Sequence, residues 1–421
     1  MTRNPLNRSA RVAVAALAAV LAACNSLLDV KVPDRVPAEL LDDPKQAGLM
    51  VNSAIGDFEC ALGSAIVVEG IISDELADAQ LGAAAWPYDR RDANTQPGGI
   101  YGVNPCDSNQ NPGIYVPLST ARWDADQALT KLEAWTDQQV ANRGSLIARA
   151  ALYAGFSYAL MGMSMCEAAF DLSAPIGQQP MFAKAEERFT TAIDAGSAAG
   201  LADVINAAYV GRGRVRLYQG ELQRAAADAQ NVPSGFVLEA SAASDNNRRY
   251  NRVYAAIVYF GLYTVDPQSR NLTTEGVPDP RAATALMSTR PADSRSTIWA
   301  PTKYASLATP LPIARYEEAQ LILAEAQGGS AAVGIINSLR DAAGLPHYAG
   351  PTDDAAIRQL IAEERRRALF AEGFRNYDIE RFNLPLVPAP GTDYPDKGGS
   401  YGTTTCLPLP DSERFNNPNA G

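Results

Sequence analysis

Two long loops of this 421-residue chain, the first rich in glycine, proline and asparagine and the second in proline, hold side chains suited to ligand binding. They span residues 83–118 and 267–301. Long loops on a rigid scaffold often carry binding sites. Exposed aromatic rings can stack on sugar faces, while arginine and carboxamide groups bond to hydroxyls. Each ring could instead pin its own loop to the core. As a set, the candidate ligand-binding residues are Trp86, Tyr88, Arg90, Tyr101 and Trp299.

The sequence lacks the short motifs of the common enzyme classes. It contains no P-loop, no GxGxxG after a predicted strand and no GxSxG. His347 is the single histidine, so Ser/His or Cys/His catalysis would depend on one residue. Carboxylates are plentiful, and a glycosidase pair stays open although no local motif selects one. We therefore predict a protein that is not an enzyme, with no catalytic residue, no cofactor and no metal site.

The first 23 residues predict an export signal. A basic start is followed by a short apolar run, residues 12–21, and then by Leu21-Ala22-Ala23-Cys24. This pattern is typical of a bacterial lipoprotein cleavage site, with lipid attached to Cys24. An ordinary secretory signal with a chance cysteine is the alternative. We predict that residues 1–23 are removed and that the acyl chains on Cys24 anchor the protein to a membrane.

Four cysteines remain after Cys24: Cys60, Cys106, Cys166 and Cys406. An even number in an exported protein favours disulfides, and four cysteines allow three connectivities. No CxxC occurs, which argues against a Cys/His zinc site. Four free, buried thiols are the alternative.

Length and charge limit the remaining possibilities. Residues 24–421 contain no flexible linker or charge run that would divide them, so we predict one large helical domain with loop insertions. The formal net charge of −11 argues against nucleic acid as a partner.

Helical periodicity runs through most of the chain. Segments 150–158 and 184–194 form one pair, and segments 207–218 and 221–229 form a second pair with a short turn. This arrangement is typical of tetratricopeptide-like hairpins. A third hairpin is predicted over 312–343, and a fourth from residue 354 into 374–382. The predicted architecture is mainly α, with hairpins forming a spine, long loops and little β-structure.

One carboxylate in this region needs a partner. Ile357, Ile361 and Ala368 share one helix face, and Glu364 falls on that same face. An unpaired buried charge is strongly unfavourable. We therefore predict a structural ion pair, with Arg340, Arg375 and Arg381 as the nearest candidates in sequence.

Residues 312–381 also carry an ordered series of motifs. They are Arg315-x-x-Glu318-x-x-Leu321-x-x-Ala324-Glu325-Ala326, Ile336-Asn337, Arg340, Ala343-Gly344-Leu345, Glu364-Arg365-Arg366, Leu369, Glu372-Gly373, Arg375, Asp378-Ile379 and Arg381. This series resembles the SusD/RagB family, the lipid-anchored nutrient-binding proteins of bacterial outer membranes. Ala368 departs from the family pattern, which usually has Glu there, and removes one expected ion pair. The charged motif residues, Arg315 and Glu318 among them, are expected to be structural.

The resemblance implies a function and a location. The protein would face the cell exterior on the outer membrane, bind an oligosaccharide or a peptide, and deliver it to a TonB-dependent, SusC-like transporter. The architecture of the family also suggests that Cys60 meets Cys166, which leaves Cys106 to pair with Cys406. A helical-repeat scaffold that binds proteins and an all-helical glycoside hydrolase are the alternatives.

Overall fold

The computed structural model describes residues 42–82, 86–93, 100–395 and 397–420. The predicted signal, residues 1–23, and Cys24 lie outside the described residues. The chain divides into two units, Met1–Gln46 and Ala47–Gly421. The described residues of the first unit contain a short 3₁₀-helix, Pro44–Gln46. The helices and strands below all belong to the second unit.

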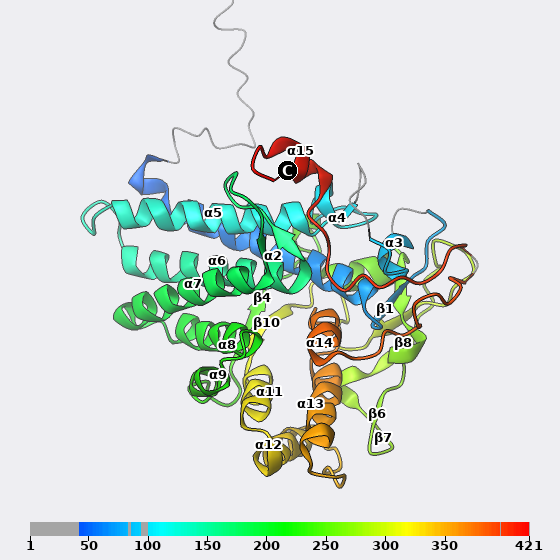
Figure 1. Ribbon diagram of the computed structural model, residues 1–421. Helices are drawn as coiled ribbons and strands as arrows, with labels where there is room; N and C mark the ends of the chain where they lie inside the picture. The colour runs from blue at the N-terminus through cyan, green and yellow to red at the C-terminus, as the bar shows by residue number, and fades with distance from the viewer. Residues whose placement is uncertain (1–41, 83–85, 94–99, 396, 421) are drawn as a thin grey trace, which may run out of the picture. The chain divides into compact units, whose positions relative to one another are not determined.

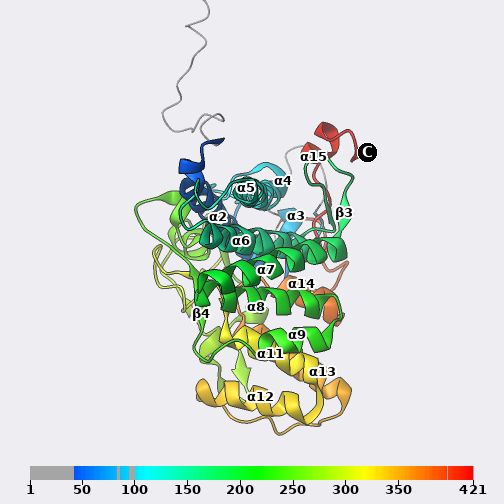
Figure 2. The same cartoon turned by 90° about the vertical axis from the view of Figure 1, so that its left-hand side faces the viewer.

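Four helical hairpins follow one another along the second unit and form its spine (Figures 1 and 2). Each helix packs on the next in the chain. This arrangement confirms the predicted mainly α fold with tetratricopeptide-type hairpins. The hairpins are α6 (Arg143–Ser164) with α7 (Gln178–Ala199), α8 (Ala202–Tyr218) with α9 (Leu222–Ala229), α11 (Tyr316–Gln327) with α12 (Gly329–Ala342), and α13 (Asp354–Ala368) with α14 (Arg375–Phe382).

Small residues let the spine helices approach closely. Phe189 of α7 is fully buried between Gly155 of α6 and Gly211 of α8. A Cβ atom at Gly155 or Gly211 would lie 2.8 or 2.4 Å from the ring of Phe189. Glycine usually weakens a helix interior. Here its lack of a side chain creates the space that a large aromatic ring fills.

Helix α2 (Ala47–Ile72) and helix α5 (Tyr115–Ala134) pack against the first hairpin. Residues 60–72 of α2 are all buried. Among the described helices, α6 has the length and apolarity of a membrane span, but 83% of its most apolar window is buried inside the protein. Its apolar composition is therefore explained by its place in the core.

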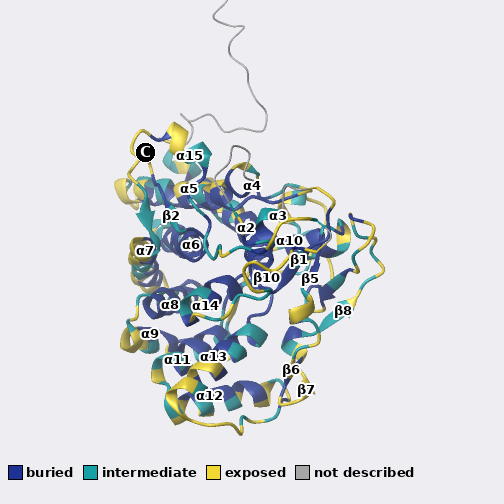
Figure 3. Cartoon of the chain, turned by 45° about the vertical axis from the view of Figure 1, so that its right-hand side comes forward, coloured by how far each residue is buried: buried dark blue, intermediate teal, exposed yellow. Residues whose placement is uncertain are grey.

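The side of the unit opposite the first hairpins is built from short strands and loops (Figures 1 and 3). The described strands pair antiparallel into two-stranded sheets. The pairs are β1 (Leu76–Asp78) with β5 (Tyr263–Val265), β2 (Glu167–Ala168) with β3 (Ile176–Gly177), β4 (Val237–Ala240) with β10 (Leu311–Arg315), β6 (Thr273–Thr274) with β7 (Val277–Pro278), and β8 (Thr284–Leu286) with β9 (Trp299–Pro301). The β2–β3 pair belongs to the connection between α6 and α7. Short helices also lie outside the spine: α3 (Trp86–Asp89), α4 (Ile100–Val103), α10 (Arg252–Tyr254) and α15 (Asp411–Asn416).

The predicted carboxylate on the inner face of α13 is buried and paired. Glu364 is 1% exposed, and it accepts hydrogen bonds from Arg281 Nη1 at 2.6 Å and from Arg340 Nε at 3.1 Å. Arg340 was one of the predicted partners, and Arg281 comes from the loop side of the chain. The prediction that Glu364 is held in an ion pair is confirmed.

The other charged motif residues also form ion pairs within the second unit. Glu318 bonds to Arg214 at 2.6 and 2.8 Å, and both side chains are buried. Arg375 bonds to Asp74 at 2.6 and 2.8 Å. The remaining contacts are Arg315 to Glu372 at 3.0 Å, Arg365 to Asp378 at 2.8 Å, and Arg381 to Asp378 and Glu325 at 2.8 and 2.9 Å.

The predicted disulfide pairing, Cys60 with Cys166 and Cys106 with Cys406, is wrong. The structure pairs Cys60 with Cys106, with Cα atoms 5.6 Å apart, and Cys166 with Cys406, with Cα atoms 5.0 Å apart. Cys60 does not end a helix, because α2 continues twelve residues further to Ile72. The loop that holds Cys106 packs on α2, where the Ser64 hydroxyl donates to the Gly113 carbonyl.

The second bridge follows from a backbone contact that the sequence does not reveal. The C-terminal tail runs beside the end of α6, where Leu407 N–H donates to the Ser164 carbonyl at 2.8 Å. Cys166 N–H donates back to the Leu407 carbonyl at 2.9 Å. This short parallel bridge brings Cys406 against Cys166. The disulfide therefore fastens the tail to the spine.

Candidate functional site

A cavity of about 720 Å³ lies where four segments of the loop side meet. Strand β1 and helix α3 supply one wall, and β5 with the turn after it supplies a second. The turn at residues 293–297 and the tail at residues 388–401 complete it. The lining residues that carry hydrogen-bonding or aromatic groups are Asp78, Trp86, Asp89, Thr264, Asp266, Gln268, Arg270, Asp293, Arg295, Ser296, Thr297, Tyr394, Lys397 and Tyr401.

The β1–β5 pair sets the first wall. Its register places Asp78 opposite Tyr263. The carboxylate of Asp78 accepts a hydrogen bond from Lys397 Nζ of the tail at 2.5 Å and one from the Gln80 N–H at 3.1 Å. Burial raises the pKa of Asp78 to about 6, and the Lys397 charge opposes that rise. The other carboxylate oxygen, Oδ1, has no hydrogen-bond partner among the described residues.

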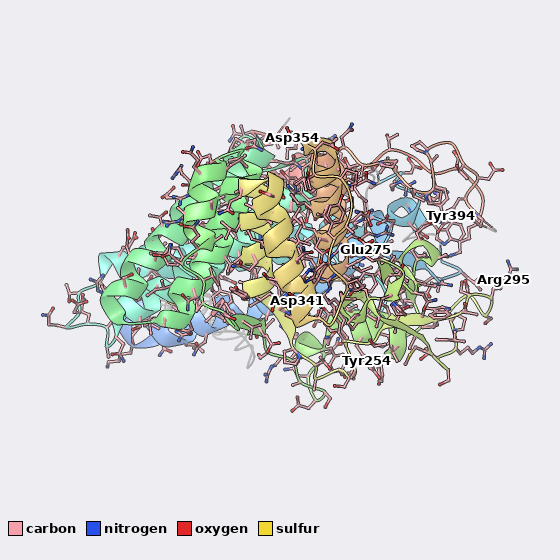
Figure 4. All side chains as sticks on the ribbon, turned by 90° about the horizontal axis from the view of Figure 1, so that it is seen from below. Tyr254, Glu275, Arg295, Asp341, Asp354 and Tyr394 are labelled. Atoms are coloured by element: carbon pink, nitrogen blue, oxygen red, sulfur yellow. A yellow bond between two sulfur atoms is a disulfide. The ribbon has the colours of Figure 1, made fainter. Side chains whose placement is uncertain are left out.

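Asp89 joins the strand wall to the tail. Its Oδ2 accepts from the Asp78 N–H at 2.9 Å and from the Tyr394 hydroxyl at 2.6 Å. Burial raises the pKa of Asp89. The ring of Tyr394 meets that of Tyr401 edge to face, with centroids 5.3 Å apart. Tyr394 and Arg295 lie on the same side of the unit, away from the helices of the spine (Figure 4).

Two further aspartates of the cavity differ in charge state. Burial raises the pKa of Asp266 to about 7, and its Oδ1 accepts from the Gln268 N–H at 2.8 Å. For Asp293, burial is outweighed by hydrogen bonds from the Ser296 hydroxyl and from backbone N–H groups, and the pKa is lowered. Proton-donating and proton-accepting carboxyl groups therefore share one cavity near neutral pH.

The tail wall is firmly held. Arg91 donates to the carbonyls of Val387 and Pro388, and its guanidinium lies 5.0 Å from the centroid of the Tyr401 ring. Gly402 N–H donates to the Arg90 carbonyl at 2.6 Å. Together with the Cys166–Cys406 bridge, these contacts fix a segment that its Pro/Gly-rich sequence would otherwise leave flexible.

One of the five predicted ligand-binding residues lines this cavity, and a second contacts residues that line it. Trp86, at the start of α3, is half-buried and lines it. Trp299 borders it, because the cavity residues Arg270 and Thr264 both contact Trp299. The guanidinium of Arg270 lies 5.4 Å from the Trp299 ring centroid, and the backbone N–H of Trp299 donates to the Thr264 hydroxyl at 2.8 Å.

The other three predicted residues make contacts that stabilise the loops. Tyr88 and Tyr101 are 3% and 1% exposed, and their rings pack edge to face at 6.0 Å. The Tyr88 hydroxyl accepts from the Tyr101 N–H at 2.6 Å. Neither ring can stack on a ligand, so their assignment as ligand-binding residues is corrected. Arg90 donates to the Gly398 carbonyl at 3.1 Å and is absent from the described cavity wall.

Several residues of the site were not selected from the sequence. Asp78 and Asp89 follow α2 in an otherwise ordinary acidic stretch, and Lys397 lies in the tail. They meet only because the tail returns from about 300 residues away. The available signal in the sequence was the presence of two tyrosines, Tyr394 and Tyr401, in a Pro/Gly-rich tail. The described residues contain no group of three or more His, Cys, Asp or Glu side chains that could hold a metal ion.

The fold and the motifs agree with one family of proteins. Residues 224–418 match the model of the SusD family. The structure also matches SusD-superfamily structures along nearly their whole length. The chain therefore resembles the SusD family in sequence over residues 224–418, and it shares the fold of SusD-superfamily structures. A comparison with curated proteins gave no match.

Similar solved structures share the fold at low sequence identity. A SusD superfamily protein from Bacteroides vulgatus is 18% identical, with a TM-score of 0.67, covering 90% of this chain and 98% of its own. A SusD-like carbohydrate binding protein from Bacteroides vulgatus is 16% identical, with a TM-score of 0.69 and coverages of 90% and 97%. A laminarin binding SusD-like protein is 17% identical, with a TM-score of 0.63 and coverages of 90% and 98%. These likenesses establish the fold.

Proposed function

We propose that this SusD/RagB-like protein binds an oligosaccharide in the cavity beside Trp86. The observation that carries the proposal is the chemistry of that cavity: an indole face beside carboxyl, hydroxyl and guanidinium groups. An aromatic face can pack on the apolar face of a pyranose ring, and polar groups around it can bond to the hydroxyls. Proteins of this fold include a carbohydrate binding protein and a laminarin binding protein, which supports the same ligand class here.

The residues around the ring would supply both donors and acceptors. Asp78 Oδ1 is a buried acceptor without a partner among the described residues. Asp293 remains ionised and accepts, whereas Asp266, with a pKa of about 7, can donate when protonated. Sugar hydroxyls need both kinds of partner, because each hydroxyl donates once and accepts up to twice. Binding would require no covalent step.

We further propose the cellular context that the family implies. Residues 24–421 would form the mature protein, anchored by lipid on Cys24 in the outer membrane and facing the cell exterior. It would pass its ligand to a TonB-dependent, SusC-like transporter. The Cys-containing Leu21-Ala22-Ala23-Cys24 segment supports the anchor, and the SusD family match supports the partner class.

The binding proposal is tested with a glycan array followed by affinity electrophoresis on the glycans retained. Trp86→Ala should weaken binding about tenfold or more, because it removes a stacking face from the cavity. Trp123→Ala is the matched control, since Trp123 is an exposed tryptophan on α5, which packs against the first spine hairpin and is not part of the cavity wall. Product analysis should show no cleavage of the bound glycan. Equal binding by Trp86→Ala and the parent protein, or turnover that Asp266→Asn abolishes, would overturn the proposal.

The anchor is tested by cell fractionation. Cys24→Ser should move the protein from the membrane fraction to the soluble fraction, because one thiol carries the acyl chains. The double variant Cys166→Ser/Cys406→Ser, which leaves Cys24 in place, should stay with the membrane and serves as the control. Retention of Cys24→Ser in the membrane fraction would contradict the lipoprotein assignment.

A further inference from the structure

A second cavity, of about 490 Å³, lies between the outer face of α13 and the start of the tail. Gln268 lines both this cavity and the cavity beside Trp86. Val387 lines the second cavity and its neighbour Pro388 lines the first. The two hollows therefore adjoin along one side of the unit. The second cavity is lined by Asp74, Gln268, Ala355, Arg358, Gln359, Ala362, Glu363, Arg366, Arg375, Phe382, Leu384, Pro385 and Val387.

Positive charge exceeds negative charge in this lining. Three arginines face two carboxylates, and both carboxylates are already engaged. Asp74 is held by Arg375 at 2.6 and 2.8 Å, and Arg366 approaches it to 3.6 Å. Although burial opposes it, these arginines lower the pKa of Asp74, so its charge is fixed. Glu363 bonds instead to Arg367 at 2.8 Å. Arg367 lies outside the lining and adds a further cation nearby.

The arginines also have unused hydrogen-bonding capacity. Within the described residues, Arg375 Nη1 and Arg366 Nε are buried donors without partners. Arg358 is exposed, and its guanidinium donates to the Arg381 carbonyl at 3.0 Å and lies 5.0 Å from the Phe382 ring centroid. No ion pair joins Arg358 to a carboxylate in the described part of the chain. A guanidinium held on an aromatic ring with its charge unneutralised is suited to bond a carboxylate or a sulfate.

We propose that this second cavity is a subsite for an anionic sugar, so that the preferred ligand is a glycan bearing carboxylate or sulfate groups. The inference rests on the proposed glycan-binding function and names the ligand class more narrowly. Leu384, Pro385 and Val387 offer an apolar wall for a sugar ring, and Gln268 and Gln359 offer amide groups to hydroxyls. Arg358 and Arg366, which lie eight positions apart on α13, each offer a guanidinium to an anionic group of the ligand. An oligosaccharide with its neutral part beside Trp86 can continue into the second cavity past Gln268.

The net charge of −11 does not prevent this mode of binding. Exposed charges further apart than the Debye length, about 8 Å at physiological ionic strength, are largely screened. A ligand in the second cavity therefore responds mainly to the arginines around it. Its affinity should fall as salt is added, whereas stacking on Trp86 should be nearly insensitive to salt.

The test uses the purified protein and a glycan array that carries acidic glycans next to their neutralised counterparts. Suitable pairs are polygalacturonate with its methyl ester, and chondroitin sulfate with its desulfated, carboxyl-reduced form. The binding constants of retained glycans are then measured by calorimetry at low and high salt. We expect an acidic glycan to bind at least tenfold more tightly than its neutralised counterpart, with the difference shrinking as salt rises.

Variants assign the effect to the second cavity. Arg358→Gln should weaken binding of the acidic glycan about tenfold, as the loss of a charge-assisted contact does, and should leave the neutral counterpart unchanged. Arg358→Lys should retain part of the affinity. Arg149→Gln is the matched control, because Arg149 is a half-exposed arginine on α6 in the spine. Thermal melts confirm that each variant is folded.

The outcomes separate this inference from the function on which it rests. If only neutral glycans bind, and Trp86→Ala weakens them, the subsite is refuted and the glycan-binding function stands. If Arg358→Gln and Arg358→Lys bind the acidic glycan as tightly as the parent protein, the subsite is also refuted. If no glycan of either class is retained, both proposals fail together.

Discussion

Buried carboxyl groups of the spine region and of the cavity beside Trp86 avoid an unpaired charge in different ways: the first are paired with arginines, and the second have a raised pKa. In the spine region, Asp378 and Glu372 are buried but lie against arginines, and these charges lower their pKa despite the opposing effect of burial. At three of the four aspartates of the cavity, Asp78, Asp89 and Asp266, burial dominates and raises the pKa. Carboxylates of the spine are therefore committed to arginine partners. Those of the cavity keep hydrogen-bonding capacity that a ligand can use.

The largest expected effect comes from removing one partner of a spine ion pair. Glu364→Ala leaves Arg281 and Arg340 without their shared acceptor in a buried place. Breaking a buried pair in this way costs about 3–5 kcal/mol of unfolding free energy. Chemical denaturation measures this loss, and glycan affinity at temperatures where the variant is folded should be unchanged.

Glu187→Ala is the control for this prediction. Glu187 is also a spine glutamate that contacts an arginine, but 68% of its side chain is exposed. Exposed pairs contribute about 0–1 kcal/mol. A Glu364→Ala variant as stable as Glu187→Ala would show that the buried pairs of the spine do not differ in stability from surface pairs.

The sequence predicted the spine better than the cavity for a physical reason. Helices arise from local periodicity, and the stripe Ile357, Ile361 and Glu364 could be read without any long-range contact. Arg340 lies 24 residues from Glu364 and was predicted as its partner, whereas Arg281 lies 83 residues away and was not. The cavity depends almost wholly on such distant contacts. Tyr394 donates a hydrogen bond to Asp89, which lies 305 residues earlier in the chain, and no local sequence pattern predicts that contact.

The cysteines and the loop aromatics show the same limit. The sequence indicated that the four cysteines form disulfides, but which cysteines pair depends on the path of the C-terminal tail. The backbone hydrogen bond from Leu407 to Ser164 fixes that path and brings Cys406 to Cys166. Trp86 and Tyr88 lie two positions apart in α3, and both are aromatic residues that the sequence marks as ligand-binding candidates. One lines the cavity and the other is buried, because side chains two positions apart on a helix face in different directions. Residue type alone could not separate them.

Glu69 provides an exception that sharpens the comparison. It lies on α2 in the core and is fully buried, yet no arginine lies among the groups that act on it. Burial raises its pKa from 4.5 to about 8, and the carboxyl groups of Glu380 and Glu75 act in the same direction. Between pH 4.5 and about pH 8, Glu69 is therefore mostly protonated in the folded protein and mostly ionised in the unfolded chain.

The sign of the stability change follows from that difference. The folded-state pKa lies above the unfolded value, so the contribution of Glu69 is complete below pH 4.5 and is lost as the pH rises toward 8. Between pH 6 and pH 8 the loss is about 2 kcal/mol. Glu69→Gln, which is neutral at every pH, should remove this part of the slope. Denaturation curves at the two pH values measure it, and an unchanged slope in Glu69→Gln would show that Glu69 is ionised in the folded state.

The smallest effect is expected from a methyl group added where spine helices meet. Gly211→Ala places a Cβ atom 2.4 Å from the Phe189 ring, which is fully buried and cannot swing aside. Overpacking of this kind costs about 1–3 kcal/mol, partly offset by about 1 kcal/mol from the higher helix propensity of alanine. Gly334→Ala on α12 is the matched control, because nothing lies within 4 Å of its added Cβ. Gly334→Ala should therefore raise the unfolding free energy by up to about 1 kcal/mol, whereas Gly211→Ala should lower it. A melt in which Gly211→Ala is stabilised as much as Gly334→Ala would show that α7 and α8 can separate freely, and that close packing around Phe189 does not hold the spine together.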